Sequence, residues 1–168
     1  MSLRDPHSRP PLLARVTAWH QLLVSGLTHL QPLAALLARV YVAQVFFLSG
    51  LTKLRDWSVT LFLFQEEYHV PLLPPELAAV MGTTGELVLP LLLVLGLGGR
   101  FAALGLSVVN VVAVLSLAEI APAALQQHIT WGVLLATLAL YGSGPWTLER
   151  WLAGRGGPAP GASRGGHN

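Results

Sequence analysis

Apolar residues dominate four segments of the chain, and each segment is about as long as a membrane-crossing helix. Such a helix needs about 20 residues, because the hydrocarbon core is ~30 Å thick and a helix rises 1.5 Å per residue. The four segments cover residues 33–54, 76–98, 101–117 and 125–142. The pattern predicts an all-α fold, an integral membrane four-helix bundle, with its transmembrane domain over residues 33–152.

An amphipathic pattern precedes the first span. Its apolar side consists of residues that recur at helical spacing: Leu12, Val16, Trp19, Leu23, Leu27 and Leu30. The opposite side is polar and includes Arg15, His20 and His29. Two interpretations are open: the helix lies in the membrane interface, or it packs on the bundle. Pro32 is expected to separate it from the first span, so residues 1–32 are assigned to a tail and an amphipathic surface helix.

A second short amphipathic helix is expected in the first external loop. Asp56 is a plausible N-cap for it. An apolar and aromatic stripe follows: Trp57, Leu61, Phe64 and Tyr68. Glu66 and Glu67 are adjacent and therefore point in different directions on a helix, so no metal site is expected there. At the other end, residues 153–168 are rich in glycine and proline and are expected to be disordered.

The composition agrees with a membrane protein. Hydrophobic residues make up 53% of the chain and charged residues only 11%, against about 25% charged in average soluble domains. The net charge of +2 is small and spread along the chain, which does not indicate a nucleic-acid partner. There is no cysteine, so no disulfide relay or iron–sulfur cluster can be built from this chain alone.

The basic residues predict the orientation in the membrane. Seven of them fall on one side of the predicted topology: Arg4, Arg9, Arg15, Arg100, Arg150, Arg155 and Arg164. Only Lys53 and Arg55 fall on the other side. Because cytoplasmic segments carry an excess of Lys and Arg, both termini are expected in the cytoplasm.

Glu86 is the main candidate for chemistry, because it lies near the middle of the second span. A carboxylate there costs roughly 2.5–3.5 kcal/mol on insertion scales, so it should face protein or trapped water. Arg39 is within ~7 Å of the same depth by helical rise, and Lys53 can reach inward from the outer half. A cluster of Glu86 with Arg39, Lys53 or both is feasible, although Lys53 could also extend to the headgroups.

Two interpretations of this cluster remain open. In the first, a buried ion pair fixes the register of the helices. In the second, a polar pocket opens outward and is lined by Glu86, Lys53, Asn110, His128 and Trp131, with Gly82 allowing a close approach of helices. Haem is not expected, because His128 is the one histidine that belongs to a predicted span.

Four stretches of the sequence resemble one known family. They are LARVYVAQVFFLSGLTKL, TLFLFQEEYHVPLLPPELAAVMGTTGELVLPLLLVLGLGGRFAAL, HITW and GSGPWTLERWL. Together, over about residues 36–152, they look like the DoxX family of bacterial membrane proteins. The end motif departs from the family, which usually has a pattern closer to GPG…SLD where this chain has Gly144-Pro145 followed by Trp146.

The resemblance implies a four-helix bundle in the bacterial cell inner membrane. One member of the family is a subunit of a thiosulfate:quinone oxidoreductase, and others are linked to membrane redox complexes. Carried onto this chain, the family's polar positions are Arg39, Lys53, Glu86, His128 and Trp131. For most members no activity is established.

Two functions from different classes follow. The first is a membrane subunit of a quinone-linked redox complex, with Glu86, Lys53 and His128 as catalytic candidates and Arg39, Asn110, Trp131 and Gly82 in the binding pocket. Its partners would be the lipid bilayer, quinone as the one candidate cofactor, and other membrane or periplasmic redox proteins. The alternative is a non-enzymatic membrane anchor or assembly partner. A small-molecule carrier is less favoured, because carriers more often have repeated halves and more spans.

Overall fold

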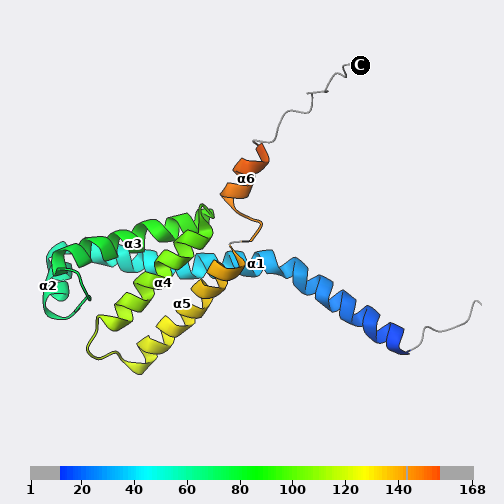
Figure 1. Ribbon diagram of the computed structural model, residues 1–168, viewed down its shortest axis with the longest axis horizontal. Helices are drawn as coiled ribbons and strands as arrows, with labels where there is room; N and C mark the ends of the chain where they lie inside the picture. The colour runs from blue at the N-terminus through cyan, green and yellow to red at the C-terminus, as the bar shows by residue number, and fades with distance from the viewer. Residues whose placement is uncertain (1–11, 143, 156–168) are drawn as a thin grey trace, which may run out of the picture.

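The computed structural model describes residues 12–142 and 144–155 (Figure 1). These residues form helices and contain no strand, which confirms the all-α prediction. The helices are α1 (Leu12–Arg55), α2 (Trp57–Glu66), α3 (Pro75–Leu95), α4 (Gly99–Leu115), α5 (Pro122–Tyr141) and α6 (Leu148–Arg155). The predicted disorder of residues 153–155 is wrong, because α6 continues through them. Residues 1–11 and 156–168, which carry the predicted tails, lie outside the described residues.

Three of these helices, α1, α3 and α5, are long and apolar enough to cross a bilayer. Helix α4 is apolar as well but has 17 residues. Each contains or closely matches one of the predicted spans. The ends differ by at most three residues, except that α1 begins at Leu12, far before residue 33. Helix α5 begins at Pro122 rather than near residue 125, because proline is favoured in the first turn, where its missing N–H is not needed.

The predicted break at Pro32 is wrong, since α1 is one continuous helix of 44 residues with Pro32 inside it. A proline already has a helical φ, and it removes only the hydrogen bond to the carbonyl four residues earlier, so a helix can bend there and continue. Figure 1 shows α1 changing direction between its N-terminal half and the half that packs on the body. The side chains of residues 12–31 are all exposed.

The first-loop helix is present as α2, and Asp56 caps it as predicted. The Asp56 carboxylate accepts hydrogen bonds from the Val59 amide at 3.0 Å and the Ser58 hydroxyl at 2.6 Å. These bonds favour the charged form and lower the pKa of Asp56. Phe64 of α2 is buried against Ala78 and Ala79 of α3, which places α2 across the N-terminal end of α3.

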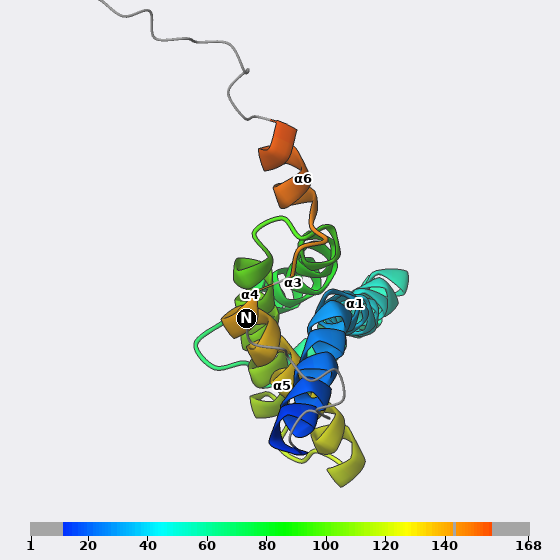
Figure 2. The ribbon, with the colours of Figure 1, turned by 90° about the vertical axis from the view of Figure 1, so that its right-hand side faces the viewer.

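The C-terminal half of α1 packs along α3, α3 packs on α4, and α4 packs on α5, while α5 touches α1 less extensively. Figure 1 shows α4 and α5 running obliquely to α1 and α3, and Figure 2 shows α6 leading away from this body. The core consists of buried residues from four helices: Val42, Phe46, Leu93, Ala102, Ala103, Leu106, Leu135 and Leu138. Most other large apolar side chains are exposed, which fits a surface that faces lipid.

A glycine sets the separation of α1 and α3. A Cβ atom built on Gly50 would lie 2.9 Å from Cγ and Cδ2 of Leu87 and 3.1 Å from Cβ of Glu86. Gly82, on α3, has more room: its Cβ would lie 3.7 Å from the ring of Phe64. Gly50 is therefore a point of close contact between α1 and α3.

We predict that Gly50→Ala and Gly82→Ala differ in stability although they make the same chemical change. Both remove a helical glycine, which favours the helix by up to about 1 kcal/mol. Only Gly50→Ala overpacks the α1–α3 contact, which typically costs about 1–3 kcal/mol. Unfolding by denaturing detergent, followed by circular dichroism, should show Gly50→Ala to be the less stable variant. Equal stability of the two variants would contradict the close contact at Gly50.

Candidate functional site

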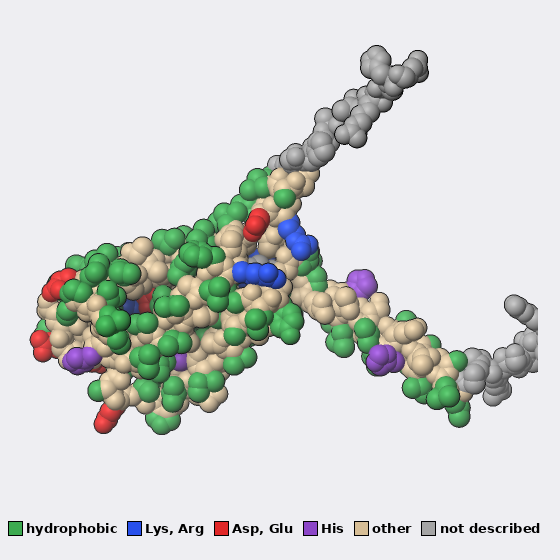
Figure 3. Space-filling view, in the orientation of Figure 1, with side chains coloured by type: hydrophobic (Ala, Val, Ile, Leu, Met, Phe, Trp, Pro, Cys, Tyr) green, Lys and Arg blue, Asp and Glu red, His purple; other side chains and the backbone are tan. Residues whose placement is uncertain are grey.

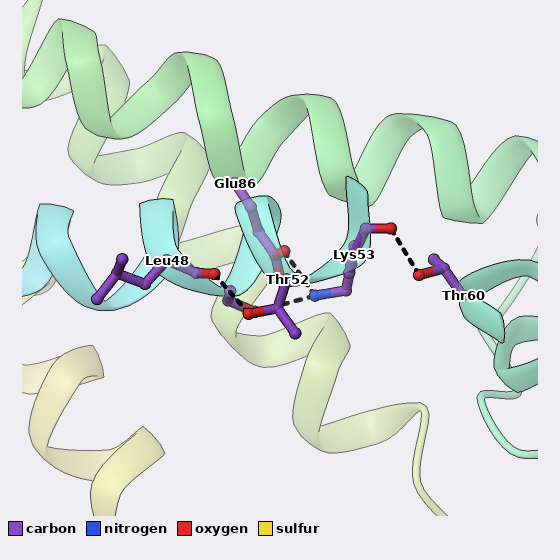
Figure 4. Close-up of polar contacts among 6 residues, drawn as sticks. Leu48, Thr52, Lys53, Thr60 and Glu86 are labelled. Atoms are coloured by element: carbon purple, nitrogen blue, oxygen red, sulfur yellow. Dashed lines mark hydrogen bonds and ion pairs between the residues drawn. The ribbon is translucent and has the colours of Figure 1, made fainter. Parts of the chain in front are cut away.

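The ion pair between Lys53 and Glu86 is the centre of the candidate site. Nζ of Lys53, in the last turn of α1, lies 2.5 Å from Oε2 of Glu86 on α3. Nζ also donates a hydrogen bond to Oγ of Ser49 at 3.0 Å. The two charged side chains keep 20% and 10% of their surface exposed, so they are largely removed from solvent. Figure 4 shows them pointing toward each other across the α1–α3 contact.

The local sequence explains why these two groups meet. Lys53 and Gly50 lie about one turn apart on α1, so the lysine lies on the side of α1 where α3 approaches. The end of α1 is also fixed to α2, because the Thr60 hydroxyl donates to the carbonyl of Lys53 at 2.8 Å (Figure 4). Lys53 thus turns inward to Glu86 rather than outward to the headgroups.

The ion pair lies in the wall of a cavity of about 440 Å³. The walls come from α1, α2 and the loop after it, α3, α4 and α5. They are mostly apolar, and the polar side chains among them are Ser49, Lys53, Tyr68, Glu86, Ser116 and His128. A mainly apolar cavity with a few polar groups is typical of a site for a small organic ligand.

Tyr68 supplies a hydroxyl from the loop after α2. Burial raises the pKa of Tyr68, and the charges of Glu67 and Glu86 raise it further. The phenol therefore keeps its proton at neutral pH and remains a donor. Its ring packs edge-on against Phe64, with centroids 5.2 Å apart.

His128 and Asn110 connect α5 to α4 at the opposite wall. Nδ2 of Asn110 donates to the carbonyl of His128 at 2.9 Å, and Nδ1 of His128 lies 2.8 Å from Oδ1 of Asn110. The ring of Trp131 packs edge-on against His128 at 4.9 Å and against Phe46 at 5.9 Å. Asn110 is buried and contacts the cavity only through its hydrogen bonds to His128, because it does not line the cavity itself.

Arg39 does not belong to this site, contrary to the predicted pocket. Its side chain is fully buried, and Nη2 donates to the carbonyl of Trp146 at 2.7 Å. A Cβ on Gly96, the left-handed cap of α3, would lie 2.9 Å from Nη1, so the guanidinium lies at the C-terminal end of α3. The cation lies at the negative end of the α3 dipole and near the segment that leads to α6. Helical rise placed Arg39 near the depth of Glu86, but the opposite direction of its side chain could not be read from the sequence.

The structure brings together most of the predicted site residues. Lys53, Glu86, His128, Trp131 and Gly82 line one cavity. One wall of the cavity was not predicted from the sequence. It is formed by α2 and the loop after it: Phe64, Tyr68, Val70 and Leu73. The aromatic stripe of α2 indicated that this helix buries one face, but the sequence did not indicate which helices or which cavity that face would cover.

In a comparison with protein families, the family model of DoxX matches residues 34–119, just over half of the 168 residues. The chain belongs to the DoxX family. A search of curated proteins found no match, and a search of solved structures found none either. Together, the family and the three candidate spans make this a multi-pass integral membrane protein.

The DoxX match begins after Pro32 and ends at Glu119, before α5. It therefore includes Lys53, Glu86 and Asn110. His128 and Trp131 lie outside the matched residues, so their place at the cavity rests on the structure of this chain. The exposed N-terminal half of α1 also lies outside the match.

We predict strong coupling between Lys53 and Glu86 in a double-mutant cycle. Removing one partner of a buried ion pair costs roughly 3–5 kcal/mol. Because both side chains keep some exposure, we expect Glu86→Gln and Lys53→Met each to fall at or below the lower end of that range. The double variant should lose much less than the sum of the two, because neither charge is left alone. Additive losses, measured by unfolding in denaturing detergent, would contradict the pairing.

Proposed function

We propose that this DoxX-family protein is the membrane subunit of a quinone-linked redox complex and that it binds quinone in the cavity around Glu86. The observation that carries the proposal is an ion pair at 2.5 Å in the wall of a mainly apolar cavity. Ionisable residues are rare within membrane-spanning segments because they are costly there, and those that occur commonly mark functional sites. The volume of about 440 Å³ lies within the range typical of sites for small ligands.

The chemistry of the walls suits a quinone head group. Such a head group is a flat apolar ring that carries oxygen atoms at its edge. The apolar side chains can cover the ring, and Lys53 and Tyr68 offer N–H and O–H donors to a carbonyl oxygen. Glu86 is the group that would accept or return a proton. The sequence contains no cysteine, so we assign the electron donor to a partner protein in the membrane or the periplasm.

We further propose that α4 crosses the bilayer with α1, α3 and α5 as a four-helix bundle in the bacterial inner membrane, with both termini in the cytoplasm. The charge distribution supports this orientation. The end with α2 carries five acidic residues: Asp56, Glu66, Glu67, Glu76 and Glu119. Figure 3 shows most acidic side chains of one face at that end and basic side chains beside the start of α6. By the positive-inside rule, the cavity and α2 would then lie on the periplasmic side.

The exposed half of α1 supports the alternative function, a non-enzymatic anchor or assembly partner. Residues 12–31 project from the body, and their apolar side chains, among them Trp19 and Leu23, are exposed. Such a surface would lie on a membrane or contact another protein. An anchor role depends on this surface and not on the cavity, so the two functions make different predictions for Glu86.

Purification in mild detergent, followed by quinone extraction and optical spectra, tests the proposed function. We predict that wild-type protein co-purifies with quinone and that Glu86→Gln retains about a tenth or less of it. Without Glu86, the Lys53 ammonium loses the partner that holds it in the cavity wall. The charge-assisted hydrogen bond that this ammonium would donate to a quinone carbonyl is worth about 1.5–3 kcal/mol, and 1.4 kcal/mol corresponds to a factor of ten. Glu76→Gln is the matched control, because Glu76 is exposed on the same helix and its carboxylate accepts a hydrogen bond from the exposed side chain of Gln65.

The control variant should retain quinone at the wild-type level. Wild-type protein that carries no quinone and no chromophore, and that binds none when quinone is added, would sink the redox proposal and leave the anchor function. Equal retention by Glu86→Gln and wild type would show that Glu86 is not part of the site.

A further inference from the structure

The paired hydrogen bonds between Asn110 and His128 fix the position of a proton. The carbonyl oxygen of His128 can only accept, so the atom of the Asn110 amide that lies 2.9 Å from it must be the nitrogen. The amide oxygen of Asn110 then faces Nδ1 of His128 at 2.8 Å. An oxygen that only accepts requires a donor, so Nδ1 carries the hydrogen.

The second ring nitrogen of His128 is therefore an acceptor. In a neutral imidazole one nitrogen donates and the other accepts, so a hydrogen on Nδ1 leaves a lone pair on Nε2. Nε2 has no hydrogen-bond partner among the described residues, and His128 lines the cavity. The neighbouring indole does not supply a donor, because Nε1 of Trp131 is directed to the hydroxyl of Tyr41 at 3.4 Å.

The opposite wall offers a second acceptor. Oε2 of Glu86 is occupied by Lys53, whereas Oε1 accepts no hydrogen bond from the described residues. The cavity thus has an acceptor on α5 and another on α3. A carbonyl oxygen cannot satisfy either of them, but a hydroxyl group can.

We propose that Nε2 of His128 accepts a hydrogen bond from a hydroxyl of the ligand, so that the cavity prefers a quinol, the dihydroxy form, over the quinone. This inference rests on the proposed function, because it concerns the redox form of the same ligand. Asn110 is a positioning residue in this arrangement: it holds the imidazole in the tautomer that exposes the acceptor. The preference comes from the buried pair on α4 and α5, and it does not require any charge on His128.

The tautomer can be measured without any ligand. Protein labelled with ¹⁵N-histidine, reconstituted in nanodiscs at neutral pH, gives two-bond ¹H–¹⁵N correlations that distinguish the two neutral tautomers. We expect His128, assigned by comparison with His128→Phe, to carry its proton on Nδ1. A proton on Nε2 would overturn the inference, whether or not a quinone binds.

The preference is measured by calorimetric titration with decylubiquinol and decylubiquinone, with partition into protein-free nanodiscs subtracted. A neutral hydrogen bond of about 1 kcal/mol corresponds to roughly fivefold tighter binding of the quinol. His128→Phe should remove this difference, so that the two forms bind within about twofold of each other. His29→Phe, the same change on the exposed part of α1, should leave the preference intact.

The outcomes separate this inference from the proposed function. Quinol preference that is present in the wild type and lost in His128→Phe supports both. Equal binding of the two forms by the wild type overturns the preference and leaves the quinone site in place. Binding of neither form overturns both. Should His128→Phe fail to fold, the wild-type tautomer and the wild-type affinity ratio still decide the matter.

Discussion

The arrangement of this protein depends on the attraction between one carboxylate and one ammonium in an apolar environment. Separated and exposed to lipid, each charge would cost several kcal/mol, and their attraction grows as the surroundings become less polar. Their Nζ–Oε2 distance of 2.5 Å makes a direct ion pair between α1 and α3. Gly50 allows the two backbones to come close enough for this contact. Charge pairing and small-residue packing therefore act at the same point.

The two ends of the helical body differ because the helices diverge. At the end near α6, buried side chains such as Leu93, Ala102 and Leu106 fill the space. Arg39 is buried there too, and its Nε and Nη1 atoms have no hydrogen-bond partner among the described residues. Its closeness to the C-terminus of α3 explains how the positive charge is tolerated, because the C-terminal end of a helix carries partial negative charge. At the other end, α2 and the loop after it cover the opening, and the cavity is what remains beneath them.

The walls of the cavity have distinct roles that come from different kinds of contact. The α1–α3 wall presents a charged pair, and the loop after α2 presents the Tyr68 phenol. The α5 wall presents an imidazole whose orientation is set by Asn110 on α4. Since most of the remaining surface is apolar, these few polar groups would decide how a ligand is oriented.

Much of the fold could be predicted from the sequence, because hydrophobic length and periodicity act locally. The spans, the Asp56 cap and the pairing of Glu86 with a cation follow from residues close together in the chain or from the cost of one buried charge. The continuation of α1 through Pro32 could not be predicted, because proline allows both a break and a bend. The sequence also left open whether Arg39, Lys53 or both pair with Glu86, because both cations can reach its depth.

Tertiary structure decided between them. Helical rise gives the depth of a residue, but the direction of its side chain depends on which neighbouring helix it faces. The close contact at Gly50 placed Lys53 opposite Glu86, whereas the guanidinium of Arg39 lies at the C-terminal end of α3. The position of Tyr68 at the cavity and the hydrogen bonds between Asn110 and His128 could not be predicted either. Each brings together residues from elements that meet only when the helices pack. The chain thus specifies by itself which groups cannot face lipid, and the packing of the helices determines which partner each group finds.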